Sequence, residues 1–190
     1  MTNPDELRQE KRRLRAELDQ EKLEQAATAL ARRIVELPEY HHAQRIAAYF
    51  AVNGEIGLHP LIDHALAAGK QVFLPNLDQQ ALRFAPYFHG QKMRQNRFRL
   101  PEPDVDDDAM LAPRDLDLVL APLVVFDADR NRIGMGGGFY DRSFAFRKNP
   151  TATSPVLIGV AHESQKVAAL EPQEWDVRLD MVVTDEAIYR

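Results

Sequence analysis

A glycine-rich segment in the last third of the chain has the composition of a phosphate-binding loop. Four of the five positions 134–138 are glycine, and a helix is expected over 140–147. Glycine admits positive φ angles and lets backbone N–H groups approach a ligand closely. A helix that begins there adds the positive end of its dipole, which favours phosphate. A tight structural turn would use the same residues, and the position between an apolar strand and a helix favours the anion cradle.

The segment differs from two common nucleotide-binding motifs. No Gly-Lys-Ser/Thr follows it, as a Walker A loop requires, and Phe139 replaces the third glycine of the dinucleotide fingerprint. Asp141 follows the loop directly, and carboxylate oxygens of this kind can hold Mg²⁺ against phosphates. The alternative for Asp141 is a carboxylate in the first turn of a helix, stabilised by the helix dipole.

The elements that must position this loop follow an α/β pattern. Residues 1–40 are expected to be helical, with Asn3 and Asp19 as caps. Farther along, apolar runs alternate with helical segments: strands are expected over 46–50, 72–74, 116–121 and 156–160, and a helix over 60–66. Such alternation predicts a mostly parallel sheet covered on both faces. We therefore expect a single α/β domain over 1–190, with the helical segment 1–40 packed on it.

Composition narrows the function classes. The 190 residues include 24 Lys plus Arg and 29 Asp plus Glu, a net charge of −5, which argues against a nucleic-acid binder. The chain contains no cysteine, which excludes disulfides, cysteine-bound metals and thiol nucleophiles. No apolar run approaches the roughly 18–20 residues of a membrane span. The first residues lack an apolar signal core, so we expect a cytoplasmic protein that contacts no membrane.

Two basic regions are candidates for contact with an anion. Residues 83–99 carry only positive charges and precede an acidic run at 102–108, so they form either a solvated loop or one face of an anion site. In the first helix, one basic face follows from spacings of three and four. Its members are Arg8, Lys11, Arg12 and Arg15.

Four blocks of sequence, in order, resemble the 5-formyltetrahydrofolate cyclo-ligase family, also called 5,10-methenyltetrahydrofolate synthetase. They are the basic helix at 11–15, the strand and acid loop at 49–56, the stretch from Asp117 through the glycine loop to Asp141, and the closing segment at 178–184. The resemblance implies a three-layer α/β/α sandwich similar to ribose-phosphate isomerase and CoA-transferase folds. It also implies a monomer that uses ATP and Mg²⁺ to convert 5-formyltetrahydrofolate into 5,10-methenyltetrahydrofolate, releasing ADP and phosphate.

The same resemblance implies the site residues, with no side chain assigned as strictly catalytic. Positioning would come from Lys11, Arg15 and the loop glycines. ATP contacts would be Lys11, Arg15, Arg132, Ile133, Gly134, Met135, Gly136, Gly137, Gly138, Phe139 and Tyr140. Folate contacts would be Phe50, Glu55, Met135, Gly136, Gly137, Gly138 and Phe139, and the metal ligands would be Asp141 and Asp180.

One departure and several alternatives accompany this assignment. Met135 stands where many family members carry Arg, and Gly137 where some carry Lys, so one or two phosphate-facing cations are either missing or supplied from elsewhere, with Arg97 and Arg142 as candidates. Trp175 is expected in the core or, alternatively, as a wall of the folate site. A regulator that binds folate or nucleotide without turnover is the main competing function. An RNA-binding accessory protein is a third, disfavoured by the acidic total.

Overall fold

The computed structural model describes residues 3–190 and begins with helices at the positions expected from sequence. They are α1 (Pro4–Ala16), α2 (Gln20–Val35) and α3 (Pro38–His42). The Asn3 side chain accepts a hydrogen bond from the Asp5 N–H at 3.0 Å, and the Asp19 side chain accepts one from the Lys22 N–H at 2.8 Å. Both caps satisfy backbone donors that have no partner inside the helix.

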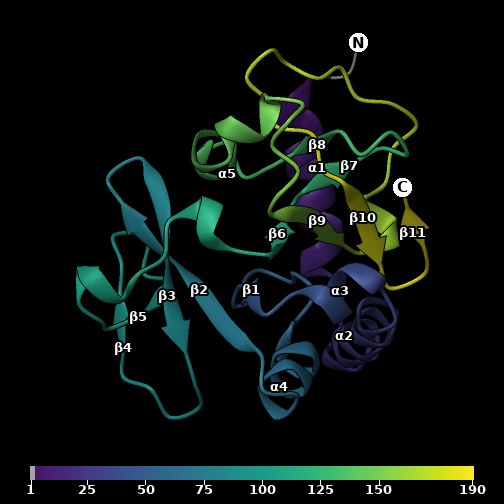
Figure 1. The fold of residues 1–190 in the computed structure, drawn as a ribbon. Coiled ribbons are helices and arrows are strands. Elements are labelled where there is room, and N and C mark those ends of the chain that lie inside the picture. Colours follow the sequence, from purple (N-terminus) through teal and green to yellow (C-terminus); the bar gives the residue numbers. More distant parts are fainter. Residues whose placement is uncertain (1–2) are drawn as a thin grey trace.

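A seven-stranded sheet forms the centre of the molecule (Figure 1). Its strands are β1 (Arg45–Ala47), β2 (Gln71–Asp78), β3 (Ala81–Tyr87), β6 (Leu118–Pro122), β9 (Val156–Ala161), β10 (Met181–Thr184) and β11 (Ile188–Tyr189). The order is β11-β10-β9-β6-β1-β2-β3, and the five inner strands are parallel. Only the edge strands β3 and β11 run antiparallel to their neighbours, so the mostly parallel α/β sheet is confirmed.

Shorter elements complete the chain. Helix α4 (His59–Ala67) connects β1 to β2, and α5 (Phe139–Ser143) follows the glycine loop. Two hairpins pair β4 (Met93–Gln95) with β5 (Pro101–Pro103) and β7 (Val125–Phe126) with β8 (Arg132–Ile133). Single 3₁₀ turns lie at Asp107–Ala109, Pro113–Asp115, Ala145–Lys148 and Glu163–Gln165.

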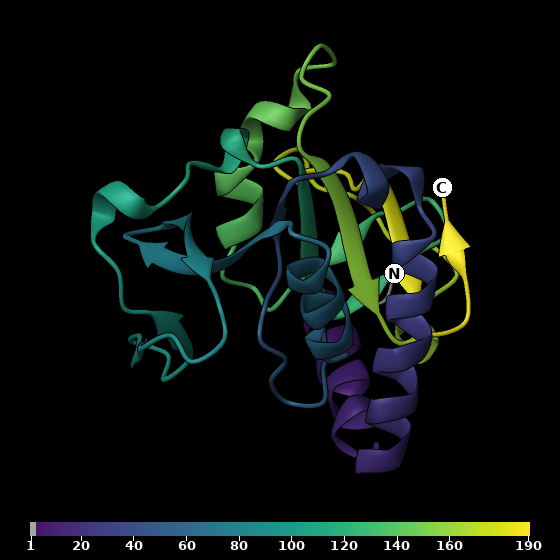
Figure 2. The ribbon, with the colours of Figure 1, turned by 60° about the horizontal axis from the view of Figure 1, so that its bottom comes forward.

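The two faces of the sheet are covered differently (Figure 2). On one face, Ile46 and Leu118 belong to a core shared with α2, α3 and α4. On the other face, Ala47 and Val119 pack against Phe126 of β7 and Phe144, which follows α5. The expected α/β/α layering therefore has one full helical layer, whereas a short helix, a 3₁₀ turn and a hairpin cover the opposite face.

Several elements differ in extent from those expected. The first strand is shorter than 46–50, and the helix expected over 140–147 divides into α5 and a 3₁₀ turn. The basic stretch 83–99 is not a simple loop, because it contains most of β3 and all of β4.

Strand β2 continues through Pro75, where the sequence predicted its end. Opposite Pro75, Phe84 exchanges both backbone hydrogen bonds with Leu111, on the side away from β2. The Pro75–Phe84 pair is therefore a non-hydrogen-bonded pair of the β2–β3 ladder, so the missing proline N–H removes no bond from it. Within residues 3–190, no helix is long and apolar enough to span a lipid bilayer.

Candidate functional site

A cavity of about 1340 Å³ lies beyond the carboxyl ends of β1 and β6, where ligands commonly bind in parallel α/β sheets. Its walls come from the loop after β1, the glycine loop, the β4–β5 hairpin and the segment 167–176. Pockets for one small ligand usually measure about 300–1,000 Å³. This cavity therefore has room for two substrates side by side.

The glycine loop forms one wall, and every residue from Arg132 to Asp141 lines the cavity. Gly138 caps α5 in the left-handed conformation, with φ of 65°, and Gly136 has φ of 93°. A Cβ atom at Gly138 would lie 2.5 Å from Nη1 of Arg142, whose guanidinium donates to the carbonyls of Gly137 and Gln80. This backbone shape therefore depends on glycine.

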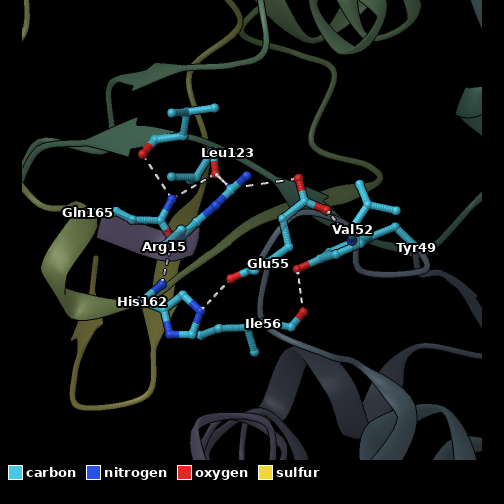
Figure 3. A network of polar contacts seen from close by, with 10 residues as sticks. Arg15, Tyr49, Val52, Glu55, Ile56, Leu123, His162 and Gln165 are labelled. Atoms are coloured by element: carbon cyan, nitrogen blue, oxygen red, sulfur yellow. Dashed lines mark hydrogen bonds and ion pairs between the residues drawn. The ribbon is translucent and has the colours of Figure 1, made fainter. Parts of the chain in front are cut away.

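The opposite wall rests on a buried network centred on Arg15 and Glu55 (Figure 3). Arg15 is only 1% exposed, and its Nη1 lies 3.7 Å from Oε1 of Glu55 and donates to the Leu123 carbonyl. The other Glu55 oxygen accepts the Val52 N–H at 3.1 Å. Burial raises the pKa of Glu55, and the Val52 N–H and Arg15 oppose that rise. Burial also lowers the pKa of Arg15, against the attraction of Glu55.

Neighbouring hydrogen bonds fix the loop that carries Glu55. The Tyr49 hydroxyl donates to the Ile56 carbonyl at 2.9 Å, and His162 lies 3.0 Å from the Gly54 carbonyl and donates to it when its proton is on Nε2. Gly54 has φ of 76°, and a Cβ atom there would lie 2.5 Å from the Arg15 carbonyl oxygen. The backbone of helix α1 therefore contacts the backbone of the loop after β1 directly at Gly54, and a side chain at that position would prevent the contact. Burial lowers the pKa of His162, which keeps the ring neutral near pH 7.

Exposed aromatic and apolar side chains form the mouth of the cavity. Phe98 is 54% exposed and lies edge-on to Phe139, with ring centres 5.9 Å apart. Phe50 packs against Tyr87 in the same manner. Trp175 lines the cavity and is 66% exposed, so the expected core position is wrong. It forms part of the cavity wall, and its contact with folate stays a prediction. Apolar side chains gathered around a hollow are typical of a binding site.

The two aspartates predicted to share a metal do not both lie at the cavity. Asp141 lines it and accepts hydrogen bonds from Arg132 at 2.5 Å and from the Val177 N–H at 3.1 Å. Asp180 does not line it, because it precedes β10 and so lies at the amino end of the sheet. There its carboxylate accepts bonds from Arg147 and from the Leu157 N–H, each at 2.7 Å.

Sequence reasoning missed a better-placed acid four residues earlier. Asp176 lines the cavity and directly precedes Val177, the residue whose N–H binds Asp141. The position of each aspartate relative to the expected strands could have distinguished them. Asp180 directly precedes a strand, whereas Asp176 lies in the long connection after β9 and can reach the edge of the sheet formed by the carboxyl ends of the strands. Across residues 3–190, no three His, Cys, Asp or Glu side chains are grouped as a metal site.

The basic side chains expected to contact the ATP phosphates make other contacts in the structure. Lys11 donates to the Ser164 carbonyl at 2.8 Å and, like the buried Arg15, does not line the large cavity. Arg97 donates to the Gln79 carbonyl, and Arg142 holds Gly137, so neither supplies a cation to the cavity. Arg8, one turn before Lys11, does line it.

Comparisons with known proteins agree over nearly the whole chain. The profile of the 5-formyltetrahydrofolate cyclo-ligase family matches residues 1–185. A 5-formyltetrahydrofolate cyclo-ligase of Escherichia coli (strain K12) is 37% identical over 186 residues, covering 96% of this chain and 98% of that protein. A protein of the same description from Haemophilus influenzae is 36% identical, covering 92% and 93%. The solution structure of Aquifex aeolicus 5,10-methenyltetrahydrofolate synthetase superposes with a TM-score of 0.84 at 26% identity, covering 98% and 92%.

Proposed function

Because the chain belongs to the 5-formyltetrahydrofolate cyclo-ligase family, we propose that it closes the methenyl ring of 5-formyltetrahydrofolate with ATP as its second substrate. The observation that carries this proposal is the cavity of about 1340 Å³, in which a glycine loop faces an acid loop and an aromatic rim. One wall suits phosphates, and the other suits a flat heterocycle with N–H groups. A reaction that transfers phosphate to folate needs both substrates bound next to each other in one cavity.

The chemistry asks for positioning and little covalent help from the protein. The formyl oxygen attacks the γ-phosphorus of ATP, and the bond to the β-phosphate breaks to release ADP. The neighbouring folate amine then attacks the activated carbon, its proton is lost, and the carbon–oxygen bond breaks to release phosphate. The backbone N–H groups of the glycine loop would orient the phosphates, as phosphoryl transfer requires.

Glu55 would bind the amino-pyrimidine edge of the folate, because a carboxylate accepts hydrogen bonds from such N–H groups. Arg15 acts behind it as a positioning residue, since its guanidinium contacts Glu55 from the protein interior. Phe50 and Phe98 would provide apolar faces for the ring system.

Magnesium would bind at Asp141 and Asp176. Both carboxylates line the cavity, one from the glycine loop and one from the segment 167–176, and Mg²⁺ usually takes one or two protein carboxylates and completes its shell with phosphate oxygens and water. The ion would neutralise phosphate charge when bound. Arg132 forms an ion pair with Asp141 in this structure. Metal binding would therefore require the Asp141 carboxylate either to contact the ion and Arg132 together or to release Arg132.

The test mixes the purified protein with 5-formyltetrahydrofolate and Mg-ATP and follows the methenyl chromophore. We expect product from the wild type, and a loss of at least about tenfold in D141N and D176N that added Mg²⁺ partly reverses. D180N is the matched control, because it removes the same charge at the far end of the sheet; its Mg²⁺ dependence should equal that of the wild type.

The outcomes separate the hypotheses. If the wild type binds folate and ATP but forms no product, the regulator is correct and the enzyme assignment fails. If D180N shifts the Mg²⁺ dependence and D176N does not, the metal lies where the sequence first placed it.

A further inference from the structure

A buried carboxylate lies behind the lining of the cavity and takes no part in the chemistry described above. Asp127 directly follows β7 and is 1% exposed. Its Oδ1 accepts the Asn131 backbone N–H at 3.0 Å. Its Oδ2 accepts the Asn131 side-chain amide at 2.9 Å and the Leu170 N–H at 2.8 Å. Burying a carboxylate is costly unless hydrogen bonds satisfy it, and here three uncharged donors do so.

The two partners of Asp127 belong to different walls of the cavity. Asn131 begins the stretch that continues into the glycine loop, Leu170 belongs to the segment 167–176, and both line the cavity. Asp127 therefore joins these two walls from behind. Hydrogen bonds to a carboxylate are roughly twice as strong as those between neutral groups, which suits a residue that fixes one wall against another.

The segment 167–176 depends on such contacts, because it contains no helix and no strand. Beyond its far end, the Val177 N–H binds the Asp141 carboxylate at 3.1 Å. Nearer its start, the Leu170 N–H binds Asp127 beside the β7–β8 hairpin (Figure 1). The span from Leu170 to Val177 is therefore held at its two ends by two carboxylates.

This span carries Asp176, one of the two carboxylates to which we assign the magnesium ion. A local turn orients it: its side chain accepts the Gln173 N–H at 2.8 Å, and its own N–H donates to the Gln173 carbonyl at 3.0 Å. The position of this turn relative to Asp141 is therefore set by the ends of the span. Mg²⁺ demands near-ideal octahedral geometry with ligands at about 2.0–2.1 Å, so a displaced carboxylate binds it less well.

We propose that Asp127 is a positioning residue, which holds the segment 167–176 against the glycine loop so that Asp176 and Asp141 can bind one ion. This inference rests on the proposed function, because it takes Mg²⁺ at those two carboxylates as the ligand. The alternative is a purely local role, since the Asp127 N–H also donates to the Asn131 carbonyl within the β7–β8 turn.

The experiment compares D127A and D127N with the control D117N. The Asp117 carboxylate accepts the N–H groups of Gln44 and Arg45 at 2.9 and 2.7 Å, so D117N disturbs the same kind of bond at the amino end of the sheet. D127A removes all three bonds of the carboxylate. D127N keeps one acceptor oxygen but turns an NH₂ group toward at least one N–H donor, so its effects should be intermediate.

Hydrogen exchange of the protein without ligands measures the segment directly. We expect exchange over 168–177 to be faster in D127A, less so in D127N, and unchanged in D117N, because amides that lose a tether open more often.

The second measurement is the Mg²⁺ concentration that gives the half-maximal rate of chromophore formation. D127A should raise it about tenfold, as the loss of an outer-shell partner of a metal site does, and saturating Mg²⁺ should restore most of the rate. D117N should keep the Mg²⁺ dependence of the wild type, even where urea unfolding shows the same loss of stability as in D127N. If D127A does not fold, D127N is compared with D117N alone.

Three results would overturn the inference and leave the proposed function intact. Exchange over 168–177 could stay at the wild-type rate in the Asp127 variants, exchange could rise while their Mg²⁺ dependence stays that of an active wild type, or D117N could shift the Mg²⁺ dependence equally. Asp127 would then serve only the β7–β8 turn or general stability. A wild type that forms no chromophore would instead remove the proposed function together with this inference.

Discussion

The two walls of the cavity are built in opposite ways. The wall that carries Glu55 is constructed like a protein core: Arg15, Tyr49 and His162 are buried, and each hydrogen-bonds to backbone (Figure 3). The glycine loop is partly exposed, and Arg8 and Arg142 hold it by donating hydrogen bonds to the carbonyls of Gly134 and Gly137. Changes in the first wall should therefore act mainly on stability, and changes in the second mainly on nucleotide use.

The largest effect is expected from R15M. Removing the guanidinium leaves Glu55 buried without its charged partner, which typically costs about 3–5 kcal/mol of unfolding free energy. Urea unfolding measures this loss. The control R13M, at an exposed side chain of the same helix, should change stability by less than about 0.5 kcal/mol.

The double variant R15M/E55Q sharpens the comparison. It removes the unpaired charge, so it should regain part of the stability that R15M loses. If R15M were as stable as R13M, the buried wall would not depend on this ion pair.

An intermediate effect is expected from G138V in the exposed wall. A β-branched residue at φ of 65° is strained by about 1–2 kcal/mol and blocks close approach of phosphate. We expect kcat/KM for ATP to fall on the order of 10- to 100-fold. G69V is the control: Gly69 has φ of 72°, nothing lies within 4 Å of its Cβ position, and it is far from the cavity. Equal kinetic losses in both variants would mean that strain alone is responsible.

The smallest effect is expected from H162Q and depends on pH. Burial lowers the pKa of His162 below its usual 6.5, so below pH 6.5 the unfolded chain takes up a proton that the folded chain resists. Stability is therefore retained above pH 6.5 and lost as the pH falls from there towards the folded-state pKa. Glutamine can still donate to the Gly54 carbonyl but cannot titrate.

The measurement is urea unfolding at pH 7.5, 6.5 and 5.5. The wild type should lose more stability than H162Q over this range, with a difference in slope of at most about 1.4 kcal/mol per pH unit for one proton. Parallel pH profiles would show that His162 is not protected from protonation.

Much of the fold could be predicted from local patterns. The strands expected over 116–121 and 156–160 became the inner parallel strands β6 and β9, the first of them beginning two residues later than expected, and Asn3 and Asp19 cap their helices. These features depend on near neighbours in sequence and on simple periodicity. The glycine loop was predictable for the same reason, because its composition and its place before a helix are local.

Side-chain positions that depend on tertiary contacts could not be predicted in this way. Helical spacing places Arg8 and Arg15 on one basic face, but only the packing of α1 on the β1 loop buries one and leaves the other at the cavity. Asp180 and Asp176 are both acids before a strand, and the path of the chain across the sheet edge decides which one reaches the ligand side.

The place of Trp175 gives this protein a built-in optical probe. It is the single tryptophan of the chain, and it lies at the rim of the cavity with most of its indole in water. Intrinsic emission excited at the indole band therefore originates at the mouth of the cavity and nowhere else in the chain. Ligands that enter the cavity should change the polarity around the Trp175 indole and therefore its fluorescence emission. Substrate entry and product exit can then be timed by stopped flow without an attached dye.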